Sequence, residues 1–186
     1  DVVCAPSSGH AREERREGVG LHRAGMNLRL RGPFDALWRA LCWPDPDALW
    51  YFAALGKARG LLGSGRYDAM LTVSNPFTSH LVGRALKPDF PGLRWLADVG
   101  DPLSPLSAMP RNNVRLYGAW NVDLERRIFA GADAVSFTTE ETSRAYARMF
   151  PESAARFQVV PPLLPAPSAE QEPTESRDGK LKLVFC

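Results

Sequence analysis

Short apolar runs alternate with helical patterns through the second half of the chain, and this alternation constrains the fold more than any other feature. Four runs are bounded by turn residues, as strands buried on both faces usually are. They lie at residues 67–73, 93–98, 132–137 and 156–160. Strands that alternate with helices predict parallel β-α-β units with right-handed crossovers.

The stretches between these runs carry apolar residues three or four positions apart, the spacing of a helix packed on a sheet. Helices are expected over residues 48–62, 76–86, 113–130 and 138–149. Thr138 and Glu141 form a T-x-x-E pattern that predicts a capping box for the last helix. Two more strands are expected at Val2–Cys4 and at residues 18–23, separated by a charged turn over 12–17. The predicted fold class is α/β, a Rossmann-like parallel sheet flanked by helices.

The domain prediction rests on composition and on the chain ends. Residues 1–160 are expected to form one α/β domain. Five prolines between Pro161 and Asp178 indicate an interdomain linker over 161–179. Residues 180–186 read as a strand that opens a further domain. Because the chain starts and stops in strands, we expect an internal fragment of a longer protein.

Composition narrows the function classes. The net charge of +2 is too balanced to indicate nucleic-acid binding. No apolar run approaches the roughly 18 residues of a membrane span. The three cysteines form no C-x-x-C pair, which favours a reducing compartment, and the three histidines have no metal-ligand spacing.

Ligands of open α/β sheets bind beyond the carboxyl ends of the strands, which selects three loops. In the first, Ser74 or Asn75 can cap the next helix, whose N-terminus would offer free N–H groups and a partial positive charge. Plain capping is the structural alternative for both residues. His80 follows in the first helical turn, where its ring either faces the cleft or packs beneath it.

The second loop places two carboxylates, Asp98 and Asp101, at the end of a strand. Such carboxylates bind sugar hydroxyls, act as a base, or accept loop N–H groups in a turn before proline. We favour a functional role for Asp101 and a turn role for Asp98. In the third loop, capping explains Thr138 and Glu141, so Thr139 and Glu140 remain as candidate ligand contacts.

Nucleotide-binding fingerprints are missing from the sequence. It contains no G-x-G-x-x-G and no G-x-x-x-x-G-K-[ST]. It also lacks G-x-S-x-G, the nucleophile motif of α/β-hydrolases. Residues for handling a nucleotide would therefore lie largely outside this chain.

The order of the segments resembles the N-terminal half of a glycosyltransferase of the GT-B fold, family 4 type. The likeness is good over residues 67–186 and loose over 1–66. It is carried by Tyr67–Val82, Arg94–Pro102, Leu124–Glu140, Phe157–Pro161 and Leu181–Phe185. The sequence departs from the family pattern at Gly100, where arginine is common, at Leu103, where an aromatic residue is common, and at Pro162–Leu163, which replaces Asn-Gly.

This resemblance implies a retaining transferase that moves a sugar from a UDP- or GDP-sugar to a lipid-linked or saccharide acceptor, in cell-surface polysaccharide synthesis. It implies no metal and no other cofactor. Asp101 would contact the acceptor or take its hydroxyl proton, and Ser74, Asn75, His80 and Asp98 would line the acceptor cleft. The family's first strand and glycine-rich loop would be missing, as would most of the donor-binding domain, so the fragment alone would be inactive.

The resemblance also implies a cytoplasmic protein, working at the inner face of the cytoplasmic membrane. One segment adds a hint of membrane contact, because it is rich in large apolar residues flanked by arginines. Its residues are Phe34, Leu37, Trp38, Leu41 and Trp43, with Arg29, Arg31 and Arg39. The alternative is that these side chains pack on the sheet.

Two other functions remain open from the sequence. A sugar-nucleotide epimerase of the same GT-B architecture would act on free nucleotide-sugar, and Asp98, Asp101, Glu140 and His80 do not exclude it. A non-catalytic α/β binding domain would need no second domain, which the strand at 180–186 argues against. An E-x7-E motif downstream of Cys186 would favour the transferase.

Overall fold

The computed structural model describes residues 1–6, 12–16, 18–25, 32–104 and 112–162. Arg29, Arg31, the strand expected at 180–186 and the linker beyond Pro162 lie outside the described residues. None of the helices in the described ranges is long and apolar enough to cross a membrane.

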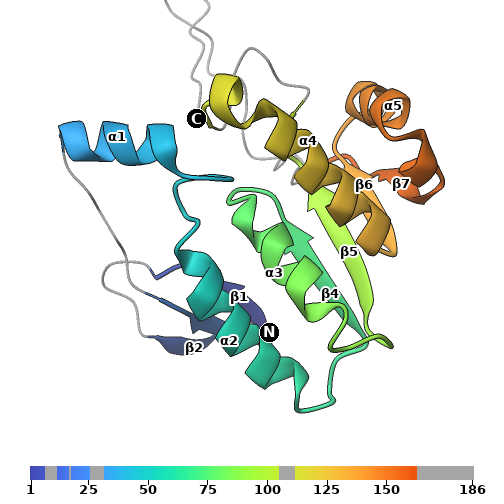
Figure 1. The fold of residues 1–186 in the computed structure, drawn as a ribbon. Coiled ribbons are helices and arrows are strands. Elements are labelled where there is room, and N and C mark those ends of the chain that lie inside the picture. The colour runs from blue at the N-terminus through green and yellow to red at the C-terminus, as the bar shows by residue number, and fades with distance from the viewer. Residues whose placement is uncertain (7–11, 17, 26–31, 105–111, 163–186) are drawn as a thin grey trace, which may run out of the picture.

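A four-stranded parallel sheet forms the centre of the domain (Figure 1). Its strands are β4 (Ala69–Val73), β5 (Arg94–Val99), β6 (Ala134–Phe137) and β7 (Phe157–Val159). They lie in chain order, and each pairs in parallel with the next. All four apolar runs of the second half are therefore strands, and the predicted α/β class with a Rossmann-like parallel sheet is confirmed.

Helices connect these strands as predicted. They are α3 (Thr78–Leu86), α4 (Val114–Gly131) and α5 (Glu140–Met149), with a short 3-10 helix η1 (Pro151–Arg156) after α5. The predicted capping box at Thr138 is wrong by one residue. Thr139 is the N-cap of α5, because it has extended backbone and its hydroxyl oxygen accepts the Thr142 N–H at 3.2 Å.

A second sheet of three strands has the order β1-β3-β2. β1 (Val2–Cys4) runs parallel to β3 (Val19–Arg23), as expected from their apolar composition. The charged turn expected over 12–17 is instead the strand β2 (Glu13–Arg16), antiparallel to β3. Charged residues suit this position because β2 is an edge strand, and Glu13 and Glu14 pair with Lys57 and Arg23.

Two helices precede the four-stranded sheet. α2 (Trp50–Leu62) packs against α3, and Ala54, Val82 and Leu86 are buried between them. α1 (Pro33–Leu41) has no buried residue and stands apart from the sheets (Figure 1). Packing on the sheet therefore does not explain the apolar residues of α1, although Trp43, just beyond its end, packs against the main core.

The main core is aromatic and lies beneath α4 and α5. Phe129 contacts Phe137, Tyr146 and Phe150 edge to face, with ring centroids 5.2–6.2 Å apart. At the other side of this core α3 lies very close to the sheet. A Cβ on Gly83 would approach the Trp95 ring at 2.7 Å, so glycine is required there. This close packing fixes the N-terminal end of α3 next to the loops that follow β4 and β5.

Candidate functional site

The first two loops selected from the sequence are joined by hydrogen bonds at the carboxyl edge of the sheet. The Ser74 hydroxyl accepts the backbone N–H of Asp101 at 2.8 Å, and the Ser74 N–H donates to the Asp98 carbonyl at 2.9 Å. Ser74 is buried, whereas Asp101 is half-buried. Ser74 therefore positions the backbone of the loop that carries Asp101 and presents little surface of its own.

Asp98 joins β5 to β6 just before the second and third loops begin. Its carboxylate accepts the Ser136 hydroxyl of β6 at 2.6 Å. A Cβ on Gly100 would lie 3.7 Å from the Thr138 methyl group, so the loops after β5 and β6 are in contact distance of each other. The larger side chain common at position 100 in the resembling family would fill the space next to Thr138. Asp98 therefore holds β5 and β6, and the loops that follow them, in position.

Neither Ser74 nor Asn75 caps α3, contrary to the prediction. The N-cap residue is Phe77, and its side chain makes no hydrogen bond to the N-terminus of the helix. Asn75 is exposed and has a φ of 78°, a left-handed conformation that asparagine tolerates better than most residues. Its side chain is therefore held at the surface of the site by the backbone of the turn.

The N-terminus of α3 is occupied by Asp45, a residue that the sequence analysis did not select. One carboxylate oxygen accepts the Thr78 N–H at 2.8 Å, and the other accepts the Thr78 hydroxyl at 2.9 Å. Burial raises the pKa of Asp45, while its bonds to Thr78 oppose that shift. The next two N–H groups, of Ser79 and His80, donate to the carbonyls of Pro76 and Phe77. The prediction of free N–H groups for a ligand at this helix end is therefore wrong.

A buried amide pair holds the segment that carries Asp45. Asn112 and Asn121 bond to each other in both directions, at 2.9 and 3.0 Å. Asn121 also accepts the indole N–H of Trp43, and Asn112 donates to the Pro44 carbonyl. Through these contacts α4 fixes the position of Asp45 at the end of α3.

His80 is fully buried beneath α3 and does not reach the surface where an acceptor would lie. The Thr72 hydroxyl accepts the indole N–H of Trp95 at 2.9 Å, so we assign its own hydrogen to His80 Nδ1, 2.8 Å away. Within the part of the chain that the structure describes, Nε2 has no hydrogen-bond partner. Burial lowers the pKa of His80 from 6.5 to about 3, so the ring is neutral at pH 7. The ring was expected either to face the cleft or to pack beneath it, and the structure shows that it packs beneath it.

This lowered pKa predicts that acid destabilises the fold. In the unfolded chain His80 takes up a proton as the pH falls below 6.5, whereas the folded protein resists protonation down to about 3. The free energy of unfolding should fall by roughly 2 kcal/mol between pH 7 and pH 5 from this group. Urea unfolding of the wild type and His80→Gln at both pH values measures it. An equal loss in both proteins would show that His80 is not the cause.

Glu125 on α4 is a second functional group that the sequence analysis missed. It is fully buried, and its Oε1 accepts the N–H groups of Leu103 and Ser104 at 3.0 and 3.2 Å. The hydroxyl of Tyr146 donates to the same oxygen. Burial raises the pKa of Glu125, and burial next to this carboxylate raises the pKa of Tyr146 well above 10. Glu125 thus fixes the backbone at the far end of the Asp101 loop.

The remaining acidic and hydroxyl candidates lie at the edge of the site. The Thr139 hydroxyl oxygen is used in capping α5, and Glu140 is exposed and lies 3.6 Å from Arg144 on the same helix. In the described ranges no three His, Cys, Asp or Glu side chains lie together in a way that could hold a metal ion. The arrangement is a surface of hydroxyl, amide and carboxylate groups around Asp101, suited to hydrogen bonds with a polyhydroxylated ligand.

A family model described as a glycosyl transferase 4-like domain matches residues 1–162, which includes all three loops. No curated protein matches the chain.

Proposed function

Because this chain belongs to the glycosyl transferase 4-like family, we propose that it is the acceptor-side half of a retaining GT-B glycosyltransferase. In the proposed reaction an acceptor hydroxyl oxygen bonds to the anomeric carbon of a UDP- or GDP-sugar. The bond from that carbon to the diphosphate breaks, and the nucleoside diphosphate leaves with both electrons. The acceptor is a saccharide or a lipid-linked sugar of a cell-surface polysaccharide.

The observation that supports this proposal most strongly is the joined set of loops around Asp101. Bonds from Ser74, Asp98 and Glu125 fix the backbone on both sides of Asp101, which is half-buried at the carboxyl edge of the sheet. A positioned carboxylate at this edge can accept the proton that the acceptor hydroxyl loses. Asn75 follows β4 and Thr139 follows β6, the two strands on either side of β5, and both residues are proposed to contact acceptor hydroxyls.

The donor is proposed to bind mainly to a second domain, which the linker at 161–179 would connect. The present chain has no glycine-rich phosphate-binding fingerprint, and Asp45 already occupies the N-terminus of α3. A positive group elsewhere must therefore stabilise the charge that develops on the leaving diphosphate. No metal or other cofactor is proposed for this step.

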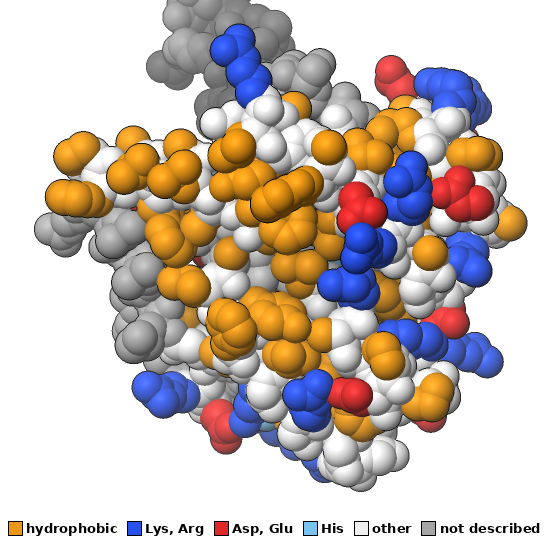
Figure 2. Space-filling model, in the orientation of Figure 1, with side chains coloured by type: hydrophobic (Ala, Val, Ile, Leu, Met, Phe, Trp, Pro, Cys, Tyr) orange, Lys and Arg blue, Asp and Glu red, His pale blue; other side chains and the backbone are white. Residues whose placement is uncertain are grey.

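The acceptor-side half is further proposed to contact a membrane surface through α1. Phe34, Leu37 and Leu41 are 55–71% exposed. Figure 2 shows apolar side chains continuing from α1 across to the start of α4. The Tyr117 hydroxyl donates to the Leu41 carbonyl at 2.6 Å, which joins the two helices. Exposed apolar side chains with Arg39 beside them on α1 favour binding to an anionic lipid surface at the cytoplasmic face.

A flotation assay tests this membrane contact. With liposomes that contain anionic lipid, the whole gene product should float, and Phe34→Asp combined with Leu37→Asp should remain at the bottom of the gradient. The two carboxylates would remove apolar contact and repel the lipid charge. Val160→Asp is the control, because Val160 is also exposed but follows β7. Equal flotation of all three proteins would contradict the proposal.

A further inference from the structure

Gly100 follows β5 directly, at a position where the described structure does not require glycine. Its φ lies outside the left-handed region that favours glycine. Among the described residues beyond its chain neighbours, an added Cβ would have one atom within 4 Å, the Thr138 methyl carbon at 3.7 Å. That is an ordinary van der Waals distance, so alanine would fit. Glycine is costly here because it leaves the unfolded chain more conformational freedom, and its benefit must come from something that approaches the backbone closely.

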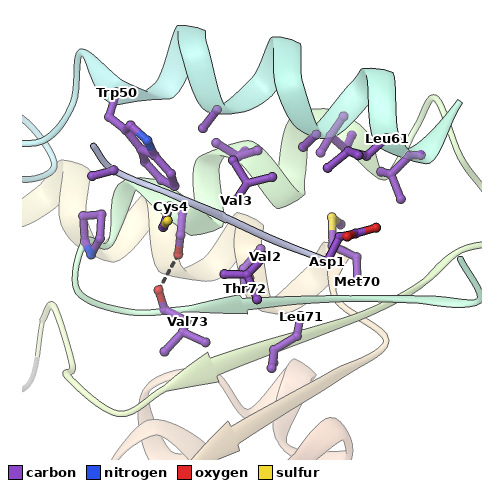
Figure 3. Close-up of a pocket in the computed structure, with 18 of the residues that line it drawn as sticks. Asp1, Val2, Val3, Cys4, Trp50, Leu61, Met70, Leu71, Thr72 and Val73 are labelled. Carbon is purple, nitrogen blue, oxygen red and sulfur yellow. Dashed lines mark hydrogen bonds between the residues drawn. The ribbon is translucent and has the colours of Figure 1, made fainter. Parts of the chain in front are cut away.

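The backbone of Gly100 also differs from the ends of the neighbouring strands in its hydrogen bonds. At the end of β4, beside the groove between β1 and β4, the Val73 carbonyl accepts the Ser79 hydroxyl at 2.5 Å (dashed line at Val73 in Figure 3). At the end of β6 the Phe137 carbonyl accepts the Val160 N–H at 2.8 Å. Within the described ranges, neither the N–H nor the C=O group of Gly100 makes a hydrogen bond. Both groups are therefore available to a ligand.

Thr138 completes a notch, which we define as the space beside the Gly100 backbone between Asp101 and Thr138. The Thr138 side chain is half-buried, and in the part of the chain that the structure describes its hydroxyl has no hydrogen-bond partner. The notch thus offers one N–H donor, one C=O acceptor and one hydroxyl that can do both.

This set of groups matches a sugar better than an anion. A sugar hydroxyl both donates and accepts, so two adjacent hydroxyls can satisfy all the groups of the notch. A phosphate or carboxylate mainly accepts, and in the notch it would lie beside the Gly100 carbonyl oxygen and the Asp101 carboxylate. The repulsion between like charges would disfavour such a ligand.

We propose that Gly100 determines acceptor specificity, because the ring of an uncharged sugar lies against its backbone. Adjacent hydroxyls of that ring bond to the N–H and C=O groups of Gly100 and to the Thr138 hydroxyl. A side chain at position 100 would occupy the space next to Thr138 and hold the ring away from the backbone. The proposal rests on the proposed function, since it places the acceptor beside Asp101. It goes beyond that function in selecting a neutral sugar and in assigning a role to a position where the sequence departs from the family pattern.

A nuclear magnetic resonance titration of the whole gene product tests the notch without reference to enzymatic activity. The probes are the methyl glycosides of glucose, mannose and galactose, with methyl glucuronide as the anionic probe. The Gly100 and Thr138 amide resonances should shift with at least one neutral glycoside and less with the glucuronide. The absence of any shift with the neutral probes would overturn the proposal, as would an equal or larger shift with the glucuronide.

Gly100→Val should weaken binding of the neutral glycoside, followed at the Thr138 resonance, by about tenfold or more, the effect of losing one well-made hydrogen bond. Gly92→Val is the matched control. Gly92 lies in a hydrogen-bonded turn before the other end of β5, and among the described residues a Cβ there would meet nothing within 4 Å. It should leave the affinity unchanged. Equal affinities of both variants and the wild type would contradict the proposal.

Gly100→Ala is a second variant that separates binding from folding. It should also weaken binding, while its urea midpoint should equal or exceed that of the wild type, because alanine restricts the unfolded chain. A lowered midpoint would show that glycine at this position serves the fold, and would overturn the proposal.

Kinetics distinguish a failure of this proposal from a failure of the proposed function. With UDP- and GDP-sugars and a membrane lipid extract, Gly100→Val should raise the apparent KM for the extract by about tenfold or more and leave the donor KM unchanged. If the wild type releases nucleoside diphosphate and Gly100→Val keeps the wild-type KM for the extract, the notch proposal is wrong and the transferase stands. If the wild type releases none but a neutral glycoside shifts the Gly100 resonance, the sugar site stands and the transferase fails.

Discussion

Asp101→Asn is expected to reduce acceptor-dependent release of nucleoside diphosphate by about a hundredfold to ten-thousandfold, the usual contribution of a general base. The amide is nearly the same size but cannot take a proton from the acceptor hydroxyl. The backbone N–H of Asp101 still bonds to Ser74, so the loop should keep its position. The measurement uses the whole gene product with UDP- and GDP-sugars and a membrane lipid extract.

Asp68→Asn serves as the matched control, because Asp68 is an exposed carboxylate just before β4, at the opposite edge of the same sheet. It should leave the rate unchanged. If release of nucleoside diphosphate survives Asp101→Asn, the protein would still be a transferase, but Asp101 would not be its general base. Conversion of one nucleotide-sugar into its epimer, without any release, would instead support an epimerase.

Glu125→Ala should lower the free energy of unfolding by about 3–5 kcal/mol, because it leaves buried donors without an acceptor. Those donors are the N–H groups of Leu103 and Ser104 and the hydroxyl of Tyr146. Glu125→Gln retains a side-chain carbonyl oxygen and should cost less. Urea unfolding at pH 7 measures both.

Glu141→Ala is the surface control for this series. Glu141 is exposed on α5, and the structure assigns the cap of that helix to Thr139. The substitution should therefore change stability little. If Glu125→Ala were no more costly than Glu141→Ala, Glu125 could not be fixing the loop after β5.

The regular elements of the second half were predictable because their signals are local. Apolar runs and three-to-four spacing identified β4 to β7 and α2 to α5 to within a few residues. β2 was missed because its four residues are all charged, and only its pairing with β3 makes it a strand. The gap between the two sheets likewise depends on which strands pair, which periodicity does not reveal.

The site was predictable in outline and not in its supporting contacts. Strand order brought the three loops together, so Asp98, Asp101 and Ser74 could be selected from their places after strands. Asp45 and Glu125 could not, because each acts on a segment distant in sequence: Asp45 bonds Thr78, 33 residues away, and Glu125 bonds Leu103, 22 residues away. A weak signal existed for Asp45, which stands between two prolines in a short turn.

The bonds among Ser74, Asp98 and Ser136 have a thermodynamic consequence for ligand binding. They connect consecutive strand ends without any ligand, so the start of each following loop is held in place before an acceptor arrives. Binding then loses less conformational entropy than it would with free loops, in which each residue fixed costs about 1–2 kcal/mol. Acceptor affinity on this half should accordingly depend on which hydroxyl groups match the preformed surface, and closely related sugars should differ mainly in enthalpy.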